Sequence, residues 1–121
     1  MDGATRDEIY RLHAEICRAL ADPNRLLLLE ELRQGERSVG QLAAALGLAQ
    51  AKTSQHLAVL REKGLVTTRR QATTVFYSLS DPMVLQAIDL LRGVLARHLE
   101  RQTSTHGMLL DELQAVGQAL P

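Results

Sequence analysis

The feature that most constrains the fold is a change in hydrophobic period near residue 65. Before that point, apolar residues recur at three- and four-residue spacing, which is typical of amphipathic helices. After it, residues 66–68 and 74–77 are β-branched or aromatic, and the polar residues 69–73 separate them. This pattern predicts a two-stranded hairpin with a basic tip. We therefore expect a mainly α fold with a small β-hairpin.

Two helices are expected in the first third of the chain. Residues 5–20 carry apolar side chains at helical spacing, with charged residues largely on the other side. Asp22 and Pro23 mark a second helix start, because a carboxylate can accept hydrogen bonds from free N–H groups and proline suits a first turn. The second helix is apolar around much of its circumference and ends near Gly35, so we expect it to be buried.

A helix–turn–helix is expected directly before the hairpin. Ser38 and Gln41 have the spacing of a capping box, which predicts a third helix starting at residue 39. Gly47 interrupts the apolar pattern, and a fourth helical run follows it and ends at Lys63 and Gly64. Two short helices joined by such a turn have helix–turn–helix geometry.

A fifth helix is expected after the hairpin. Asp81 and Pro82 repeat the cap-and-proline pattern, and apolar residues then recur at helical spacing as far as Leu99. The predicted order is α-α-α-α-β-β-α, which is a winged helix-turn-helix. We expect one DNA-binding and dimerisation domain over residues 1–103, and a C-terminal extension over residues 104–121 that is either helical or partly disordered.

The net charge of zero conceals an uneven distribution. Residues 1–47 hold six Arg and eight acidic residues, residues 48–78 hold five Lys or Arg and one Glu, and residues 79–121 hold three Arg and five acidic residues. The net charges of these three segments are therefore −2, +4 and −2. A basic middle segment between acidic flanks favours contact with DNA, whereas a solvated charged face is the alternative.

The remaining composition bounds the class of protein. Cys17 is a single cysteine, which excludes an intrachain disulfide and fits a reducing compartment. No signal peptide and no apolar stretch of membrane-spanning length is visible, so we expect a cytoplasmic protein without a membrane partner. The hydrophobic core of a chain this short is only marginally stable by itself, which favours a homodimer. No catalytic or phosphate-binding motif stands in a suitable context, so we expect neither an enzyme nor a cofactor.

Four stretches of the chain resemble the signature of the ArsR/SmtB family of transcriptional repressors. They are ADPNRL at 21–26, SVGQLA at 38–43, SQHLAVLREKGLV at 54–66 and YSL at 77–79. The resemblance covers roughly residues 8–100. It implies a repressor that binds an inverted repeat of double-stranded DNA as a homodimer, joined through the first and fifth helices.

The resemblance also implies which side chains contact DNA. On the fourth helix and in the hairpin these are Gln50, Lys52, Ser54, Gln55, His56, Arg69, Arg70 and Gln71. Gln can pair with adenine through two hydrogen bonds, and Lys or Arg can contact phosphate or guanine. The alternative for His56 is packing at the helix surface. Ala49 and Ala51 stand where many relatives carry serine, which removes possible phosphate contacts.

The metal-binding positions of the family are poorly matched. Zinc-sensing relatives use four Asp, His or Glu ligands on the fifth helix, and the corresponding residues here are Asp81, Met83, Val94 and Arg97. Relatives that bind softer ions use a Cys-x-Cys pair near the third helix, whereas residues 37–41 here contain no sulfur. We therefore expect both metal sites to be absent.

Two alternatives stay open. His13 and Cys17 share one face of the first helix, and with His98 and His106 they are candidates for a metal- or thiol-responsive site at a dimer interface. The plainer interpretation makes Cys17 a small interface hydrophobe and the histidines solvated. The second alternative is a winged-helix protein-interaction module that does not bind DNA.

Overall fold

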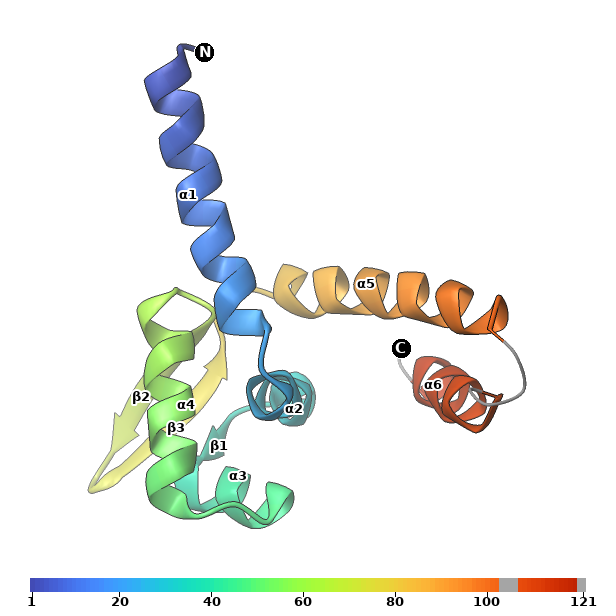
Figure 1. Cartoon of the computed structure of the whole chain (residues 1–121). Helices are drawn as coiled ribbons and strands as arrows, with labels where there is room; N and C mark the ends of the chain where they lie inside the picture. The colour runs from blue at the N-terminus through green and yellow to red at the C-terminus, as the bar shows by residue number, and fades with distance from the viewer. Residues whose placement is uncertain (103–106, 120–121) are drawn as a thin grey trace. The chain divides into compact units, whose positions relative to one another are not determined.

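The computed structural model describes residues 1–102 and 107–119, in two units that comprise residues 1–82 and 83–121 (Figure 1). The helices of the first unit are α1 (Gly3–Leu20), α2 (Pro23–Glu31), the 3-10 helix η1 (Leu32–Gln34), α3 (Val39–Leu46) and α4 (Gln50–Glu62). Its strands are β1 (Arg37–Ser38), β2 (Val66–Gln71) and β3 (Thr74–Leu79). The second unit contains α5 (Met83–Glu100) and α6 (Gly107–Ala119).

The second helix begins where the sequence predicts. The Asp22 carboxylate accepts hydrogen bonds from the backbone N–H groups of Asn24 and Arg25, at 2.9 and 3.1 Å. Its burial is less complete than expected. Leu28 and Leu29 are fully buried, but Leu26 and Leu27 are 36% and 50% exposed, so α2 covers the core with one face only.

The helix–turn–helix of α3 and α4 is also confirmed. Both hydrogen bonds of the capping box are present at Ser38 and Gln41, with donor–acceptor distances of 3.2 and 2.9 Å. Gly47 ends α3 with φ at +65°, a conformation in which glycine has no steric penalty. The buried side of α4 consists of Thr53, Leu57 and Leu60.

The wing is a three-stranded antiparallel sheet in the order β1-β3-β2. The hairpin pairs Val66 with Leu79 at one end and Gln71 with Thr74 at the other. The third strand, β1, was not expected, because it is two residues long and pairs Arg37 with Tyr77 far along the chain. A strand this short has no hydrophobic period of its own.

The second unit consists of two helices. Within it, α5 confirms the fifth helix expected after Pro82, and α6 lies in the C-terminal extension. None of the helices described in the structure is long and apolar enough to cross a membrane.

Candidate DNA interface

Helix α4 has two chemically distinct sides. Thr53, Leu57 and Leu60 are fully buried, and the Thr53 hydroxyl donates a hydrogen bond to the carbonyl of Ala49 at 3.0 Å. This burial fixes how the helix is rotated about its axis. The exposed polar side chains expected to contact DNA are Gln50, Lys52, Ser54 and Gln55.

These four side chains form no hydrogen bond or ion pair with any residue that the structure describes. Glutamine, lysine and serine side chains carry donors and acceptors that suit base edges and phosphates. We call this set, Gln50, Lys52, Ser54 and Gln55, the polar face of α4.

The first turn of α4 is open as well. Its N-cap residue is Ala49, which provides no side-chain hydrogen bond to the helix. The first backbone N–H groups of a helix have no partner inside the helix, and they attract anions when no side chain caps them. This helix start is therefore chemically suited to a phosphate.

His56 is placed apart from the polar face of α4. Its ring is half-buried, with Nδ1 3.5 Å from Nη1 of Arg25, and its Nε2 is buried without a partner among the described residues. His56 therefore lies apart from the exposed set, and its contact with DNA stays a prediction. The sequence carried a signal, because His56 follows buried Thr53 by three residues and precedes buried Leu60 by four.

Arg25 links the helices around His56. Its Nε donates to the carbonyl of Ala19 at 2.6 Å and its Nη2 to that of Arg18 at 3.2 Å, so it joins α2 to the end of α1.

The backbone N–H groups of Arg25 and Asn24 lower the pKa of the Asp22 carboxyl, because they stabilise its charged form.

The two wing arginines differ in their contacts. Arg69 donates from Nε and Nη2 to both carboxylate oxygens of Glu36, and its guanidinium lies 5.0 Å from the centre of the Phe76 ring. The hydrogen bonds from Arg69 lower the pKa of the Glu36 carboxyl. Arg69 also donates to Oε1 of Gln71 at 3.1 Å. Arg70 is exposed and pairs with no described residue, so it is the free cation of the hairpin.

The metal candidates lie on α1, on α5 and outside the described residues. His13 and Cys17 are both exposed on α1, and His98 is exposed on α5. His106 lies outside the described residues. Within residues 1–102 and 107–119, no group of three or more His, Cys, Asp or Glu side chains is arranged to hold a metal ion.

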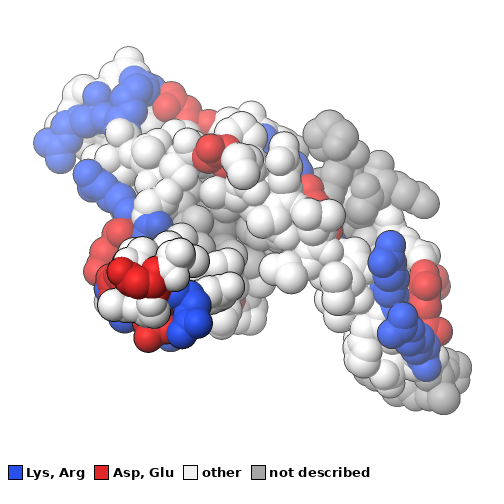
Figure 2. Space-filling view, turned by 90° about the horizontal axis from the view of Figure 1, so that it is seen from above, with Lys and Arg blue, Asp and Glu red and all other residues white. Residues whose placement is uncertain are grey.

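Basic side chains form separate groups on the face seen in Figure 2, each bordered by acidic or uncharged side chains. The surface there is not one continuous basic field.

Comparisons with known proteins agree with this geometry. The model of the family described as bacterial regulatory protein, arsR family, matches residues 22–68. An uncharacterized HTH-type transcriptional regulator of Mycobacterium tuberculosis is 37% identical over 114 residues, which is 93% of this chain and 96% of that protein.

Two further relatives regulate transcription in opposite directions. The biofilm growth-associated repressor of Agrobacterium fabrum is 44% identical over 81 residues, covering 67% of this chain and 69% of the relative. The transcriptional activator HlyU of Vibrio cholerae is 49% identical over 76 residues, covering 63% of this chain and 70% of the relative.

A solved structure gives the assembly of one relative. The homodimeric winged helix-turn-helix DNA-binding domain from Mycobacterium bovis matches with a TM-score of 0.75 and 31% identity, over 84% of this chain and 94% of that chain. The sequence relatives and this shared fold give one conclusion: the chain belongs to the ArsR family of winged helix-turn-helix, DNA-binding transcriptional regulators.

Proposed function

We propose that the protein is a repressor that binds an inverted repeat of double-stranded DNA as a homodimer. The observation that carries this proposal is the polar face of α4, whose side chains have no partner in the described chain while the opposite side of the helix is fully buried. In a helix–turn–helix, such a helix enters the major groove. The relatives include both a repressor and an activator, so the direction of regulation is tested by the reporter assay below.

The dimer is proposed to form through α1 and α5. On α1, the side chains of Ile9, Leu12 and Ile16 are 38–48% exposed although they are apolar. On α5, Leu91 and Val94 are each 63% exposed. Exposed apolar stripes of this kind favour burial against a second subunit. The homodimeric relative supports a dimer, and the choice of α1 and α5 as its interface rests on these apolar stripes.

The DNA contacts are proposed in two groups. Gln50 and Gln55 would contact base edges, with Lys52 and Ser54 on bases or backbone. In the wing, Arg70 would contact phosphate, with Gln71 beside it. Because Glu36 and Phe76 hold the Arg69 side chain, its proposed part is to orient the hairpin tip.

The test of DNA binding is a titration of DNA from upstream of the protein's own gene, followed by fluorescence anisotropy at several salt concentrations. We expect tight binding that weakens steeply with salt. Arg70→Gln should reduce the salt slope by about one. The matched control is Arg6→Gln on α1, which should leave the slope unchanged. Binding no tighter than to random DNA would support the protein-interaction module instead.

Footprinting and a reporter assay test the remaining parts. Two recognition helices related by a twofold axis should protect an inverted repeat with half-sites about one helical turn apart. Protection of a single half-site would contradict the dimer. Deleting the gene should raise transcription from the protected promoter, and a fall in transcription would make the protein an activator.

The proposed repressor does not use the metal ligands of its family. Stoichiometric zinc or cadmium should therefore leave the DNA complex intact in the same titration. The second candidate, a site at His13 and Cys17, is favoured by their shared exposure one helical turn apart on α1. Metal-driven release of DNA that Cys17→Ser abolishes would establish that candidate and overturn the expectation.

A further inference from the structure

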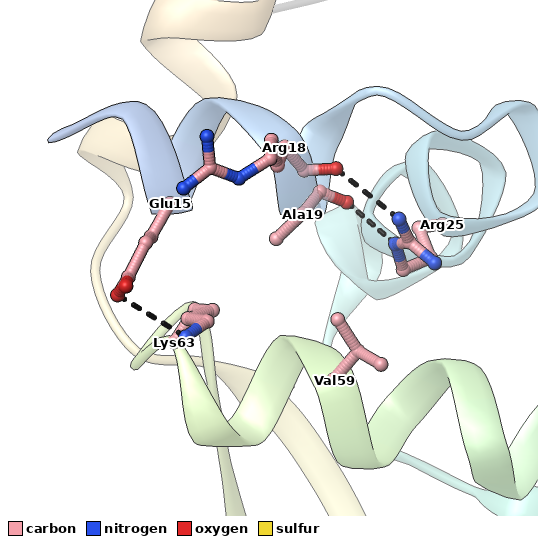
Figure 3. Close-up of a pocket in the computed structure, with 6 residues that line it drawn as sticks. All are labelled: Glu15, Arg18, Ala19, Arg25, Val59 and Lys63. Atoms are coloured by element: carbon pink, nitrogen blue, oxygen red, sulfur yellow. Dashed lines mark hydrogen bonds and ion pairs between the residues drawn. The ribbon is translucent and has the colours of Figure 1, made fainter. Parts of the chain in front are cut away.

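We propose that a pocket in the first unit, where α1, α2 and α4 meet, is a binding site for a small dianion, such as a phosphate group or a short dicarboxylate. Its volume is about 260 Å³. Figure 3 shows its lining, which consists of Glu15, Arg18, Ala19, Arg25, Val59 and Lys63.

The charges of the lining favour an anion. The lining contains three cationic side chains, those of Arg18, Arg25 and Lys63, and one carboxylate, that of Glu15, which is a formal balance of +2 among the lining residues. The Arg18 guanidinium forms no hydrogen bond or ion pair with a described residue, which leaves its donors for a ligand. A dianion would match the excess positive charge.

Two of the cations are held in place by the protein. Arg25 is fixed at the pocket wall by its hydrogen bonds to the carbonyls of Arg18 and Ala19 (Figure 3). The Nζ of Lys63 lies 3.2 Å from Oε2 of Glu15 and 3.9 Å from Oε1 of Glu62, so two carboxylates hold the ammonium group in place. A site whose cations are already immobilised loses less conformational entropy when an anion binds.

The size of the pocket limits the ligand. Its volume of about 260 Å³ leaves space for a small ligand. Inorganic phosphate or a four-carbon dicarboxylate fits this space. A nucleotide is larger and would have to extend beyond the pocket.

The pocket and the proposed dimer stripe use different faces of α1. Arg11 bridges Glu8 and Glu15 at helical spacing, and Arg18 continues that charged row toward the pocket. Ile9 and Ile16 follow a separate apolar row along the helix. Dimerisation along the apolar row would leave the charged row accessible.

The Glu15–Lys63 ion pair connects α1 to the C-cap of α4. A dianion that engages Lys63 would compete with Glu15 and weaken this connection. Because α4 carries the proposed DNA contacts, the anion would then act as an effector that lowers DNA affinity. This regulatory step rests on the proposed function, whereas the binding site itself rests on the pocket alone.

Calorimetric titration of the full chain with inorganic phosphate and with succinate tests the site, with sodium chloride at equal ionic strength as the blank. We expect saturable binding of at least one dianion. Arg18→Gln should weaken it about tenfold, because a charge-assisted donor is lost. Arg6→Gln, an arginine substitution on the same helix outside the pocket, should leave the affinity unchanged.

Glu15→Gln should change the anion affinity in the opposite direction, and this distinguishes an effect on the binding site from a loss of folded structure. Removing the one carboxylate should tighten anion binding several-fold, since a repulsive charge is removed. General loss of structure would weaken it instead. The proposed site would be overturned if neither anion gave a saturable heat of binding. It would also be overturned if Arg18→Gln and Arg6→Gln lost equal amounts of anion affinity.

The regulatory step is tested by repeating the DNA titration with saturating anion. Wild-type affinity should fall more than in sodium chloride of equal ionic strength, and Arg18→Gln should not show this extra fall. An anion that binds without changing DNA affinity would overturn the effector role. If the protein fails to bind its upstream DNA at all, the proposed function fails, while calorimetry on the protein alone still decides the site.

Discussion

Helices α3 and α4 form one helix–turn–helix but begin in opposite ways. The first turn of α3 is closed by the reciprocal hydrogen bonds of Ser38 and Gln41. The first turn of α4 follows Ala49 without a side-chain cap, and its neighbouring polar side chains have no partner in the described chain. The difference indicates that α3 is complete as a supporting helix, whereas α4 leaves its start available to an external acceptor such as phosphate.

The largest effect on stability should come from the buried leucines, because both helices have one. Leu57 on α4 and Leu42 on α3 are each 0% exposed. Truncating either to Ala should lower the free energy of unfolding by about 2–5 kcal/mol, because it removes buried contacts and leaves a cavity. Chemical denaturation measures the loss, and exposed Gln55→Ala is the control. If Leu57→Ala lowered the free energy of unfolding by less than about 1 kcal/mol while Leu42→Ala lowered it as expected, α4 would be packed less firmly on the core than α3.

The next effect separates the helices by function. Lys52→Gln removes an exposed cation of the polar face of α4, so DNA affinity should fall and the salt slope should decrease by about one. The free energy of unfolding should stay within about 0.5 kcal/mol of wild type. Anisotropy and denaturation on the same preparation provide both values. Unchanged DNA binding would remove Lys52 from the proposed interface.

A smaller effect is expected at the capped helix. Ser38→Ala breaks the capping box of α3 and should cost about 1 kcal/mol of stability. Its DNA affinity should match wild type under conditions in which the variant is fully folded. If DNA affinity instead falls while stability is unaltered, Ser38 contacts DNA and α3 is not simply a supporting helix.

The smallest effect is expected from adding a cap to α4. Ala49 already has the extended conformation of an N-cap, with φ −61° and ψ 141°. Ala49→Ser should therefore raise the free energy of unfolding by about 0.5–1 kcal/mol. Ala51→Ser, one residue inside the helix, is the matched control and should not stabilise. Equal denaturation midpoints for both variants would show that the start of α4 gains nothing from a cap.

The predictable parts of the fold depend on neighbouring residues. Asp22 and Ser38 cap helices through N–H groups two or three positions away, so short motifs identify them. The polar face of α4 likewise follows from helical spacing.

The unpredicted contacts join distant parts of the chain. Glu36 and Arg69 are 33 positions apart, and Arg25 and His56 are 31 apart. No periodic pattern links such pairs. Sequence alone therefore could not distinguish engaged Arg69 from free Arg70.

The pairing of β1 with β3 has a consequence for how the domain folds. It joins Arg37 to Tyr77, so a loop of 39 intervening residues must close before the third strand can add, whereas the hairpin pairs Gln71 with Thr74 across a two-residue turn. Local contacts close faster than distant ones. The hairpin should therefore assemble first and β1 should add last. The turn residue Ala72 has φ +55°, which glycine adopts more easily, so Ala72→Gly should speed refolding in stopped-flow experiments.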